Sequence, residues 1–438
     1  MIQIRQRHTE FMQRDIIMLV ILALLITAAF FPSLGTTDIN VQLSWGNNAY
    51  KHGIVEGYAL NQHENPPGLT CILWAVYKLA ALFGIYVFYA IKVSFLPFLF
   101  ASTVILYRWS KGNLPATLFF YAMLTYSCMT LSYVDIYFTP FLLLAFYMLH
   151  RGKSAQSMFA FTLACFIKYS PLIIFPFFIV FIIFLYVKHD DENSMRRQSY
   201  YSLLLPSGLL LILTFLVFGL EPLKALQQGV FGHNMLNAQA LNLNWIIKRI
   251  IQLTTDTIPM VSRFNPIVNI IGDSQIDGTI KIISRVLFGG FYLSAFLLFL
   301  KRKKSLENLL LFSLLGHFSY FMFSIGVHEN HLYLSCLLTA ALFCINPAYL
   351  YLAVGLSAIS SINMFLFYGI DGRHIPMIFP PLNPKTCAYD PSWMNACYPF
   401  DIRLLLAIFN LGYFLSLWAV IIDKRQEINY GSTEKTDY

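Results

Sequence analysis

Residues 67–111 read PGLTCILWAVYKLAALFGIYVFYAIKVSFLPFLFASTVILYRWSK, and this stretch decides how the chain is threaded through a membrane. It contains two apolar blocks, a short one at 67–83 and a longer one at 85–107. The longer block has the length of a membrane-spanning helix, whereas the short block carries Trp74, Tyr77 and Lys78, residue types that favour the interface. The topology depends on whether one block crosses or both do.

The Lys and Arg residues decide between these two possibilities. If both blocks crossed, the basic residues after the second block would face outward, and every later basic cluster would be inverted with them. If only 85–107 crosses, all these clusters face the cytoplasm, as the positive-inside rule predicts. We therefore expect 67–83 to lie in the interface or to re-enter the membrane. The clusters concerned are Arg108 with Lys111, residues 150–153, Lys188 with Arg196 and Arg197, residues 301–304, and Lys424 with Arg425.

The apolar runs predict an all-α polytopic membrane protein with about 12 transmembrane helices and with interfacial helices in the first outward loop. We expect one integral membrane domain over residues 1–438, with cytoplasmic ends at 1–14 and 424–438. The first helix, 16–31, is expected to be retained because no small-residue cleavage pattern follows it. The other predicted spans are 85–107, 114–132, 137–150, 155–170, 172–188, 199–218, 281–300, 307–325, 332–346, 349–368 and 402–422.

Composition supports this class of protein. Of the 438 residues, 57% are hydrophobic and 12% are charged, whereas soluble domains carry about 25% charged residues. The net charge of +8 comes from basic residues at the ends of spans, so binding to nucleic acid is not expected. The chain contains no Asn-x-Ser/Thr sequon, which favours a bacterial inner membrane over the alternative, the ER membrane. Cys387 and Cys397 share one polar loop, and the sequence leaves open whether they form a disulfide or stay two free thiols.

The predicted outward side collects the long polar segments 33–84, 219–280 and 369–401, which places the functional side there. Asp38 closely follows the first span. A carboxylate at this surface can act as a general base on a hydroxyl of a substrate that arrives in the lipid. The alternative is a structural aspartate at a helix start, since residues 36–38 also resemble an N-cap.

Further polar residues are expected on the same side. His63 and Glu64 come just before Pro66-Pro67, where they form either a wall of a site or a loop anchor. Asp135 lies in a tight outward turn, where an acid is costly unless it serves a purpose. Lys168 lies at the outer end of a span, where it can reach the interface, pair with Asp135 or hold a phosphate.

The segment 327–331 places His328, Glu329 and His331 between two spans. The spacing lacks the His-Glu-x-x-His zinc pattern, so imidazoles that donate to a phosphate leaving group are favoured over a metal site. A divalent metal stays possible, and no other cofactor is expected. Arg373 and His374 open the last outward loop and add a cation and a donor. No nucleotide-binding motif is present, so a sugar donor carried on a membrane lipid fits these groups better.

These motifs, in order, resemble the C-type (GT-C) membrane glycosyltransferases, which use polyprenyl-phosphate sugars. Within them the chain is most similar to the dolichyl-phosphate-glucose glucosyltransferases of the ER and their bacterial relatives. The matching elements are Asp38 with Trp45 and Asn65-Pro66-Pro67-Gly68-Leu69-Thr70, Val134-Asp135 with Phe138, Lys168-Tyr169-Ser170-Pro171 with residues 175–178, Val327-His328-Glu329, and, more distantly, Asn242-Leu243-Asn244-Trp245. Asn330 stands where the family has a Lys.

The resemblance implies an inverting hexosyltransferase in which Asp38 deprotonates the acceptor hydroxyl. His328, Arg373, His374 and Lys168 are then expected at the donor phosphate, and Trp45, His63, Glu64, Asp135, Glu329 and His331 are expected to shape the site. The expected partners are a polyprenyl-phosphate donor of glucose or mannose, a lipid-linked glycan acceptor and membrane lipids. Two alternatives stay open, a transporter or lipid flippase and a polysaccharide polymerase or ligase.

Overall fold

A computed structural model describes the backbone of residues 2–61, 65–188, 193–232, 235–254, 276–373 and 402–430. Side chains are described for 14–61, 65–185, 203–230, 235–254, 276–373 and 402–422. Within these residues the regular elements are helices, accompanied by isolated β-bridges. The chain divides into two compact units: unit 1 comprises 1–233, 296–314 and 333–376, and unit 2 comprises 234–295, 315–332 and 377–438.

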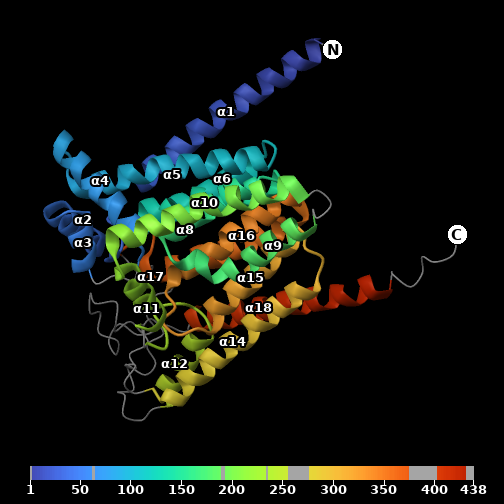
Figure 1. Ribbon diagram of the computed structural model, residues 1–438. Coiled ribbons are helices and arrows are strands. Elements are labelled where there is room, and N and C mark those ends of the chain that lie inside the picture. Colours follow the sequence, from blue (N-terminus) through green and yellow to red (C-terminus); the bar gives the residue numbers. More distant parts are fainter. Residues whose placement is uncertain are drawn as a thin grey trace. The chain divides into compact units, whose positions relative to one another are not determined.

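Unit 1 is built from long helices that pack against one another, with α7 against α5 and α8, α10 against α8, α1 against α6, and α16 against α17. Figure 1 shows α2, α3 and α4 together at one end of these helices. The elements are α1 (Ile2–Phe30), α2 (Asp38–His52), α3 (Ile54–Leu60), α4 (Pro67–Phe83), α5 (Val87–Trp109), α6 (Leu114–Thr125), η1 (Tyr126–Thr130), η2 (Val134–Tyr137), α7 (Thr139–His150), α8 (Ser154–Ile167), η3 (Ser170–Ile174), α9 (Phe175–Lys188), α10 (Asn193–Phe218), α11 (Glu221–Phe231), α16 (Tyr333–Ile345), η6 (Pro347–Tyr349) and α17 (Leu350–Tyr368).

Unit 2 contains α12 (Leu243–Thr254), η5 (Glu329–Leu332) and α18 (Ile402–Tyr430). The helices α14 (Gly278–Lys301) and α15 (Leu306–Phe323) each contribute one part to each unit. Aromatic side chains form the centre of unit 2, where Phe291 stacks on Phe323 and meets Phe414 edge-on. The buried Asn410 of α18 donates to the carbonyl of Leu241, which fixes α18 beside the start of α12.

Every predicted span coincides with a helical segment, so the all-helical prediction is confirmed for the described residues. Five helices are long and apolar enough to cross a membrane by themselves, and a sixth span results if the bent pair α10–α11 is one crossing. These helices are compatible with a polytopic membrane protein, and the number of crossings stays a prediction. The five helices are Val87–Trp109, Gly278–Lys301, Leu306–Phe323, Pro347–Tyr368 and Ile402–Ile422.

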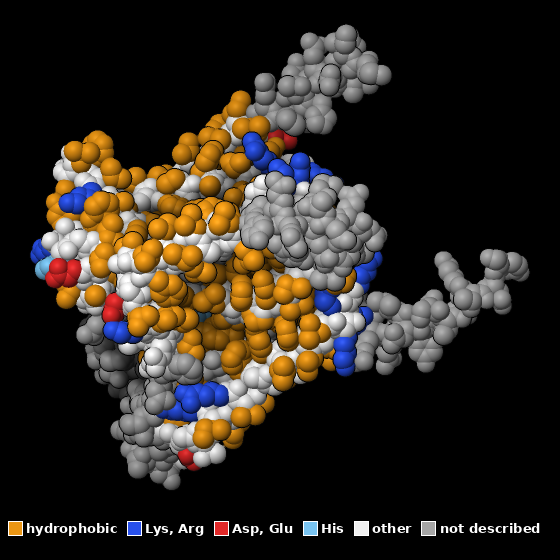
Figure 2. All heavy atoms as spheres, viewed as in Figure 1, with side chains coloured by type: hydrophobic (Ala, Val, Ile, Leu, Met, Phe, Trp, Pro, Cys, Tyr) orange, Lys and Arg blue, Asp and Glu red, His pale blue; other side chains and the backbone are white. Residues whose placement is uncertain are grey.

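Large apolar side chains are exposed along the helices. Leu82, Phe100, Leu216, Val286 and Leu405 are all more than half exposed. Figure 2 shows such side chains covering much of the visible surface between the helix ends. Soluble proteins rarely expose apolar surface on this scale, because contact with water is unfavourable. The pattern instead fits helices whose outer faces contact lipid.

One end of unit 1 is strongly basic. The rings of Trp109 and His150 lie 5.9 Å apart and bring the α5–α6 and α7–α8 connections together. The hydroxyl of Tyr349 donates to Glu307 Oε1 at 2.6 Å and joins the α16–α17 connection to the α14–α15 connection. Figure 2 shows Lys and Arg side chains gathered toward the right of the view, where Figure 1 places the α5–α6 and α14–α15 connections. The basic residues of these connections are Arg108, Lys111, Arg151, Lys153, Lys301, Arg302, Lys303 and Lys304.

The opposite end of unit 1, which we call the loop end, holds the irregular segments. They are residues 31–37, 131–135, 168–169, 219–222 and 369–373, together with α2 and α3. At this end α10 turns by 100° into α11 at Gly219, whose φ of +59° is unfavourable for residues other than glycine. The short helix α11 lies within the segment 219–280 that the sequence pattern predicts as a loop.

Candidate active site

Asp38 is the first residue of α2, and its side chain is exposed at the loop end of unit 1. A carboxylate in the first turn of a helix is stabilised by the helix macrodipole. Thr37 occupies the N-cap position, but its side chain makes no capping hydrogen bond. The helix expected after residue 37 is therefore present, whereas the expected threonine cap is not made.

Two sets of hydrogen bonds tie the surroundings of Asp38 to the turn at 131–135. The backbone N–H and the hydroxyl of Thr36 both donate to the carbonyl of Leu131, at 3.1 Å each. One turn after Asp38, Gln42 Nε2 donates to the carbonyl of Ser132 at 2.6 Å. Because these bonds flank Asp38 in the sequence, they hold its helix start against the turn that leads to Asp135.

Asp135 and Lys168 form an ion pair, with 2.6 Å between Lys168 Nζ and Asp135 Oδ1. The two side chains are only 5% and 15% exposed, so this pair is largely removed from water. The hydroxyl of Thr139 donates to the Asp135 backbone carbonyl and also lies 2.8 Å from the hydroxyl of Tyr333. Of the roles considered for Lys168, the structure therefore shows the pairing with Asp135.

Arg373 lies next to the segment that precedes Asp38. Its Nε donates to the carbonyl of Gly35 at 3.3 Å, and its backbone N–H donates to Asp371 Oδ1 at 3.1 Å. The preceding Gly372 packs so closely that a Cβ there would lie 2.9 Å from the Gly35 carbonyl carbon and 2.8 Å from the Thr130 carbonyl oxygen. The start of the last predicted outward loop thus contacts the start of the first one.

The first loop folds as two short helices followed by α4. Asn61 Nδ2 donates to the carbonyl of Trp45, which links the end of α3 to the middle of α2. Pro67 opens α4, and Gly68 packs against the Phe166 carbonyl at the end of α8, where a Cβ would lie only 2.4 Å from that oxygen. The block 67–83 is therefore a helix that begins at Pro67, and its place at the membrane interface stays a prediction. His63 and Glu64 lie outside the described residues.

Tyr58 and Tyr169 link the first loop to the bend between α10 and α11. Tyr58 donates to the carbonyl of Asn65 at 3.0 Å, and Tyr169 donates to the carbonyl of Pro222 at 2.6 Å. Burial, followed by the neighbouring Tyr169 and Glu221, raises the pKa of Tyr58 well above its ordinary value. The sequence motifs include Tyr169 but not Tyr58, and they did not predict these contacts, because the contact of Tyr169 joins segments that are far apart in the chain.

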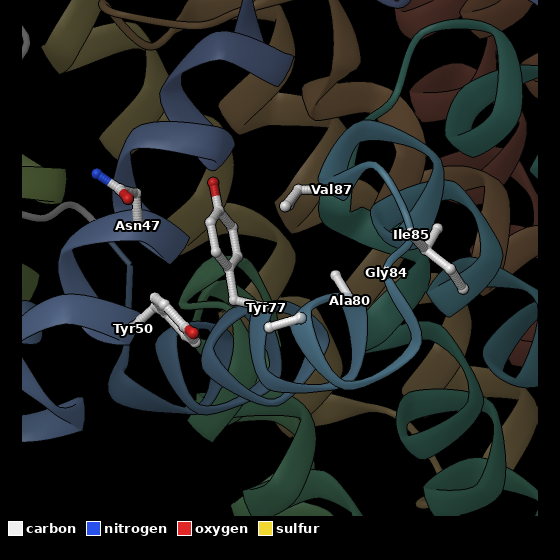
Figure 3. Close-up of a pocket in the computed structure, with 8 residues that line it drawn as sticks. Asn47, Tyr50, Tyr77, Ala80, Gly84, Ile85 and Val87 are labelled. Carbon is white, nitrogen blue, oxygen red and sulfur yellow. The ribbon is translucent and has the colours of Figure 1, made fainter.

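An open hollow of about 340 Å³ lies between α2, α4 and the start of α5 (Figure 3). Tyr50 and Tyr77 form one side, with ring centres 6.0 Å apart, and Asn47 adds an amide. Gly46 allows Tyr77 to approach α2, and the Tyr77 hydroxyl donates to the carbonyl of Leu43. Aromatic rings beside an amide can contact a sugar or a lipid, and the hollow lies on the helix that begins with Asp38.

Unit 2 contains the segment 327–331. The Nδ1 atom of His331 accepts the backbone N–H of His328 at 3.3 Å and lies 3.1 Å from the Tyr320 hydroxyl. The rings of His328 and His331 meet at 5.3 Å, and Glu329 is 3% exposed. Both histidines are half-buried. The two histidines therefore lie close together, and their role at a donor phosphate stays a prediction. Another histidine, His317, is buried within α15.

Buried asparagines form a frame around this segment. Asn242 donates to the carbonyl of Phe321 and accepts from Asn237 and from the Trp245 backbone N–H. Asn244 donates to the carbonyl of Ser324. Residues 235–238 then run beside 326–328, with hydrogen bonds from Gly326 to Met235 and from Ala238 to Val327. The motif Asn242-Leu243-Asn244-Trp245 therefore supports the histidine segment rather than standing apart from it.

Of the predicted site residues, the structure joins Asp135 and Lys168 in an ion pair and places Arg373 against Gly35, in the segment that leads to Asp38. Trp45 belongs to the same unit, whereas His328, Glu329 and His331 belong to unit 2. His374, Cys387 and Cys397 lie outside the described residues. Among the side chains that are described, no group of three His, Cys, Asp or Glu residues has an arrangement that could hold a metal ion.

Lys92 is a residue of the loop end that the motif analysis missed. It lies in α5 and is fully buried, and its ammonium donates to the backbone carbonyls of Phe31 and Ser33. A lysine inside an apolar run was the signal that could have identified it.

Neither a protein-family model nor a curated protein matches this chain.

Proposed function

We propose that the protein is an inverting glycosyltransferase that moves a hexose, glucose or mannose, from a polyprenyl-phosphate donor to a lipid-linked or other extracytoplasmic glycan acceptor. The observation that carries the proposal is the contact between Arg373 and Gly35. It brings a cation suited to a phosphate close to the segment that ends at Asp38, the carboxylate suited to an acceptor hydroxyl. The ordered resemblance to the C-type enzymes supports the same reaction.

In the proposed reaction the acceptor hydroxyl attacks the anomeric carbon of the hexose in one step. A bond forms between the acceptor oxygen and this carbon, and the bond from the carbon to the phosphate oxygen breaks. The electron pair of the broken bond stays on polyprenyl phosphate, and the hydroxyl proton passes to the Asp38 carboxylate. Asp38 is exposed at the start of α2, so the proton can then leave to water.

The leaving phosphate gains negative charge, which nearby cations and hydrogen-bond donors stabilise. Arg373 binds the Gly35 carbonyl through Nε, and we assign its terminal guanidinium nitrogens to the phosphate. The resemblance to the C-type enzymes implies His328 and His374 as further donors. The buried pair of Asp135 and Lys168 acts in this proposal as a support for the turn that holds the α2 start, rather than as a direct ligand.

The distribution of charge supports an active site on the outer side of the membrane. The basic connections of unit 1 gather at one end, and the positive-inside rule assigns such an end to the cytoplasm. Asp38, Arg373 and the hollow beside Tyr50 belong to the opposite, loop end. A donor whose phosphate sits at the membrane surface would meet these residues there.

The donor class is tested with the purified full-length protein in lipid nanodiscs and a lipid extract of its source membrane as acceptor. Three radiolabelled lipids are offered separately: polyprenyl-phosphate glucose, polyprenyl-phosphate mannose and an oligosaccharide on polyprenyl diphosphate. The proposal predicts transfer from one of the two monosaccharide donors. Transfer from the diphosphate alone would identify a polymerase or ligase instead. Movement of labelled lipid across the bilayer of proteoliposomes, without transfer, would identify a flippase.

Orientation is tested separately, with a single cysteine in place of Thr37 and a membrane-impermeant maleimide applied to intact cells. Labelling of residue 37 from outside is expected. As the control, a cysteine in place of Lys111, at the basic end of unit 1, should react only after the membrane is opened. The reverse pattern would contradict an outward-facing site.

A further inference from the structure

We propose that Lys92 is a positioning residue that holds residues 31–37, which we call the strap, and thereby sets the place of Asp38. The Lys92 ammonium donates to the Phe31 carbonyl at 2.9 Å and to the Ser33 carbonyl. The strap is the part of the chain that links the end of α1 to the first residue of α2. This inference rests on the proposed function insofar as Asp38 is the base.

The burial of Lys92 is the first observation behind this inference. Its side chain is 0% exposed and lies in the second turn of α5. Burying an ammonium is costly unless its donors are satisfied, and ionisable residues within apolar helices are therefore retained for a purpose. Besides the two carbonyls, the Lys92 ammonium lies 5.2 Å from the ring centre of Phe88 and 5.9 Å from that of Phe31.

The backbone carbonyls that accept from Lys92 explain how its buried ammonium finds hydrogen-bond partners. Helix α1 ends at Phe30, so the Phe31 and Ser33 carbonyls continue the C-terminal end of that helix. This end of a helix carries partial negative charge, and lysine side chains commonly bind its last carbonyls. The two carbonyls thus compensate the charge of Lys92. In turn, Lys92 fixes the direction in which the chain leaves α1.

The strap has two further anchors beyond Lys92. Arg373 donates to the carbonyl of Gly35, and Thr36 donates twice to the carbonyl of Leu131. Contacts at residues 31, 33, 35 and 36 therefore hold almost the whole strap, and Asp38 follows two residues later. Of these anchors, Lys92 holds the first half, where the chain changes direction.

The same turn of α5 also reaches the Asp135 segment. Ser94 lies two residues after Lys92, and its hydroxyl is 2.6 Å from the hydroxyl of Tyr137 in η2. One rigid helix thus contacts both the strap before Asp38 and the short helix that contains Asp135. A helix is a more precise support than a loop for a group that must be held in one place.

The chain offers a matched control for a purely structural lysine. Lys304 Nζ donates to the carbonyls of Phe299, Leu300 and Arg302 at 2.8–2.9 Å and lies 4.9 Å from the Phe299 ring centre. It therefore caps the end of α14 with the same chemistry that Lys92 applies to the end of α1. Lys304 lies in the basic α14–α15 connection, away from the strap. If Lys92 were only a cap, the two lysines would respond alike to substitution.

The experiment compares Lys92→Met and Lys304→Met in the full chain in nanodiscs, by two readouts. The first is amide hydrogen exchange of peptides that cover residues 31–40. We expect Lys92→Met to raise exchange at Thr36, Ile39 and Asn40, whose N–H groups are bonded at the strap and the α2 start, and Lys304→Met to leave it unchanged. The second readout is sugar transfer, where Lys92→Met should lower kcat about tenfold or more, because small displacements of a base are costly, with KM unchanged.

The outcomes separate the two proposals. Unchanged exchange of the strap in Lys92→Met would overturn the positioning role of Lys92, whatever the transfer rate. Equal losses of kcat in the two variants would also overturn the positioning role, since a general loss of stability would then explain both losses. Absence of transfer by the wild-type protein from either monosaccharide donor would overturn the proposed function, while the exchange readout would still decide whether Lys92 holds the strap. If Lys92→Met does not fold, Lys92→Gln, which retains a neutral donor, takes its place in both readouts.

Discussion

Lys168 and Asp135 form an ion pair of 2.6 Å between the end of α8 and the short helix η2. Both side chains are largely buried, so neither charge can be compensated by water if its partner is removed. The pair therefore fastens the turn at 131–135, on which the strap and Gln42 are anchored. The ion pair is therefore linked to the helix start at Asp38 through the turn at 131–135.

Breaking this ion pair should be costly. We expect Lys168→Met to reduce the free energy of unfolding by about 3 kcal/mol, because it leaves a buried carboxylate without its cation. The matched control is Lys224→Met, which removes the exposed pair with Glu221 and should cost less than about 1 kcal/mol. Unfolding in mixed micelles measures both values. Similar values for the two variants would mean that the buried pair does not hold the turn.

Gly372 should tolerate no side chain. Its φ is +87°, and a Cβ would meet both Thr130 and Gly35. We expect Gly372→Ala to displace the 369–373 segment from the strap and to raise hydrogen exchange at Thr36. Gly152→Ala is the control, because Gly152 has a φ of +71° but open space around it; it should cost about 1 kcal/mol from backbone strain alone. If both variants leave exchange at the strap unchanged, the close packing of Gly372 on Gly35 is not what holds the strap.

Loss of the Tyr58 phenol proton should lower the stability of the folded protein in alkaline solution. Burial raises its pKa above the ordinary value of 10.0, so the folded protein holds the phenol proton more tightly than the unfolded chain does. This contribution is complete below pH 10 and is lost as the pH rises toward the folded-state pKa. We expect the thermal midpoint of the wild type to drop as the pH rises above about 10, and less so in Tyr58→Phe.

The same substitution also removes the bond from Tyr58 to the Asn65 carbonyl, which should cost about 1 kcal/mol at neutral pH. Tyr351→Phe, at a tyrosine that is 86% exposed, serves as the control and should follow the wild-type curve. Identical alkaline curves for Tyr58→Phe and the wild type would contradict the burial of the Tyr58 phenol.

Arg373 should contribute to donor binding. We expect Arg373→Gln to raise the KM for the polyprenyl-phosphate donor about tenfold, which corresponds to about 1.4 kcal/mol, because a charge-assisted contact to phosphate is lost. Lys224→Gln removes another exposed cation of the loop end, one that pairs with Glu221, and should leave KM within about twofold, as expected for a surface ion pair away from the phosphate. A KM that rises equally in both variants would indicate a general effect of surface charge rather than a phosphate site.

The helices of unit 1 could be predicted because hydropathy is a local property of the sequence. The block 85–107 becomes α5 at Val87–Trp109, and the block 67–83 becomes α4 with the same bounds. The helix start at Asp38 was likewise indicated by residues 36–38, which resemble an N-cap. Such features depend on neighbours within a few residues, which a pattern can capture.

The contacts of the site could not be predicted in this way. Arg373 and Gly35 are separated by 338 residues, and no local pattern indicates that they meet. Lys92 was overlooked because a single lysine hardly changes the hydropathy of its run. The helices α11 and α12 fall in 219–280, where amphipathic sequence with buried polar residues, such as Asn244 and Arg249, does not reach the hydropathy of a span.

The most direct test of the central claim is the rate at which Asp38→Asn releases polyprenyl phosphate from a polyprenyl-phosphate hexose in the presence of acceptor. Asn preserves the size of the side chain but cannot take the hydroxyl proton. Asp277→Asn is the control, because Asp277 is also an exposed aspartate beside a helix start, next to α14. We predict a loss of about 100-fold or more for Asp38→Asn, as expected when a general base is removed, and wild-type release for Asp277→Asn. Release by Asp38→Asn at the wild-type rate, with the protein folded, would contradict the account.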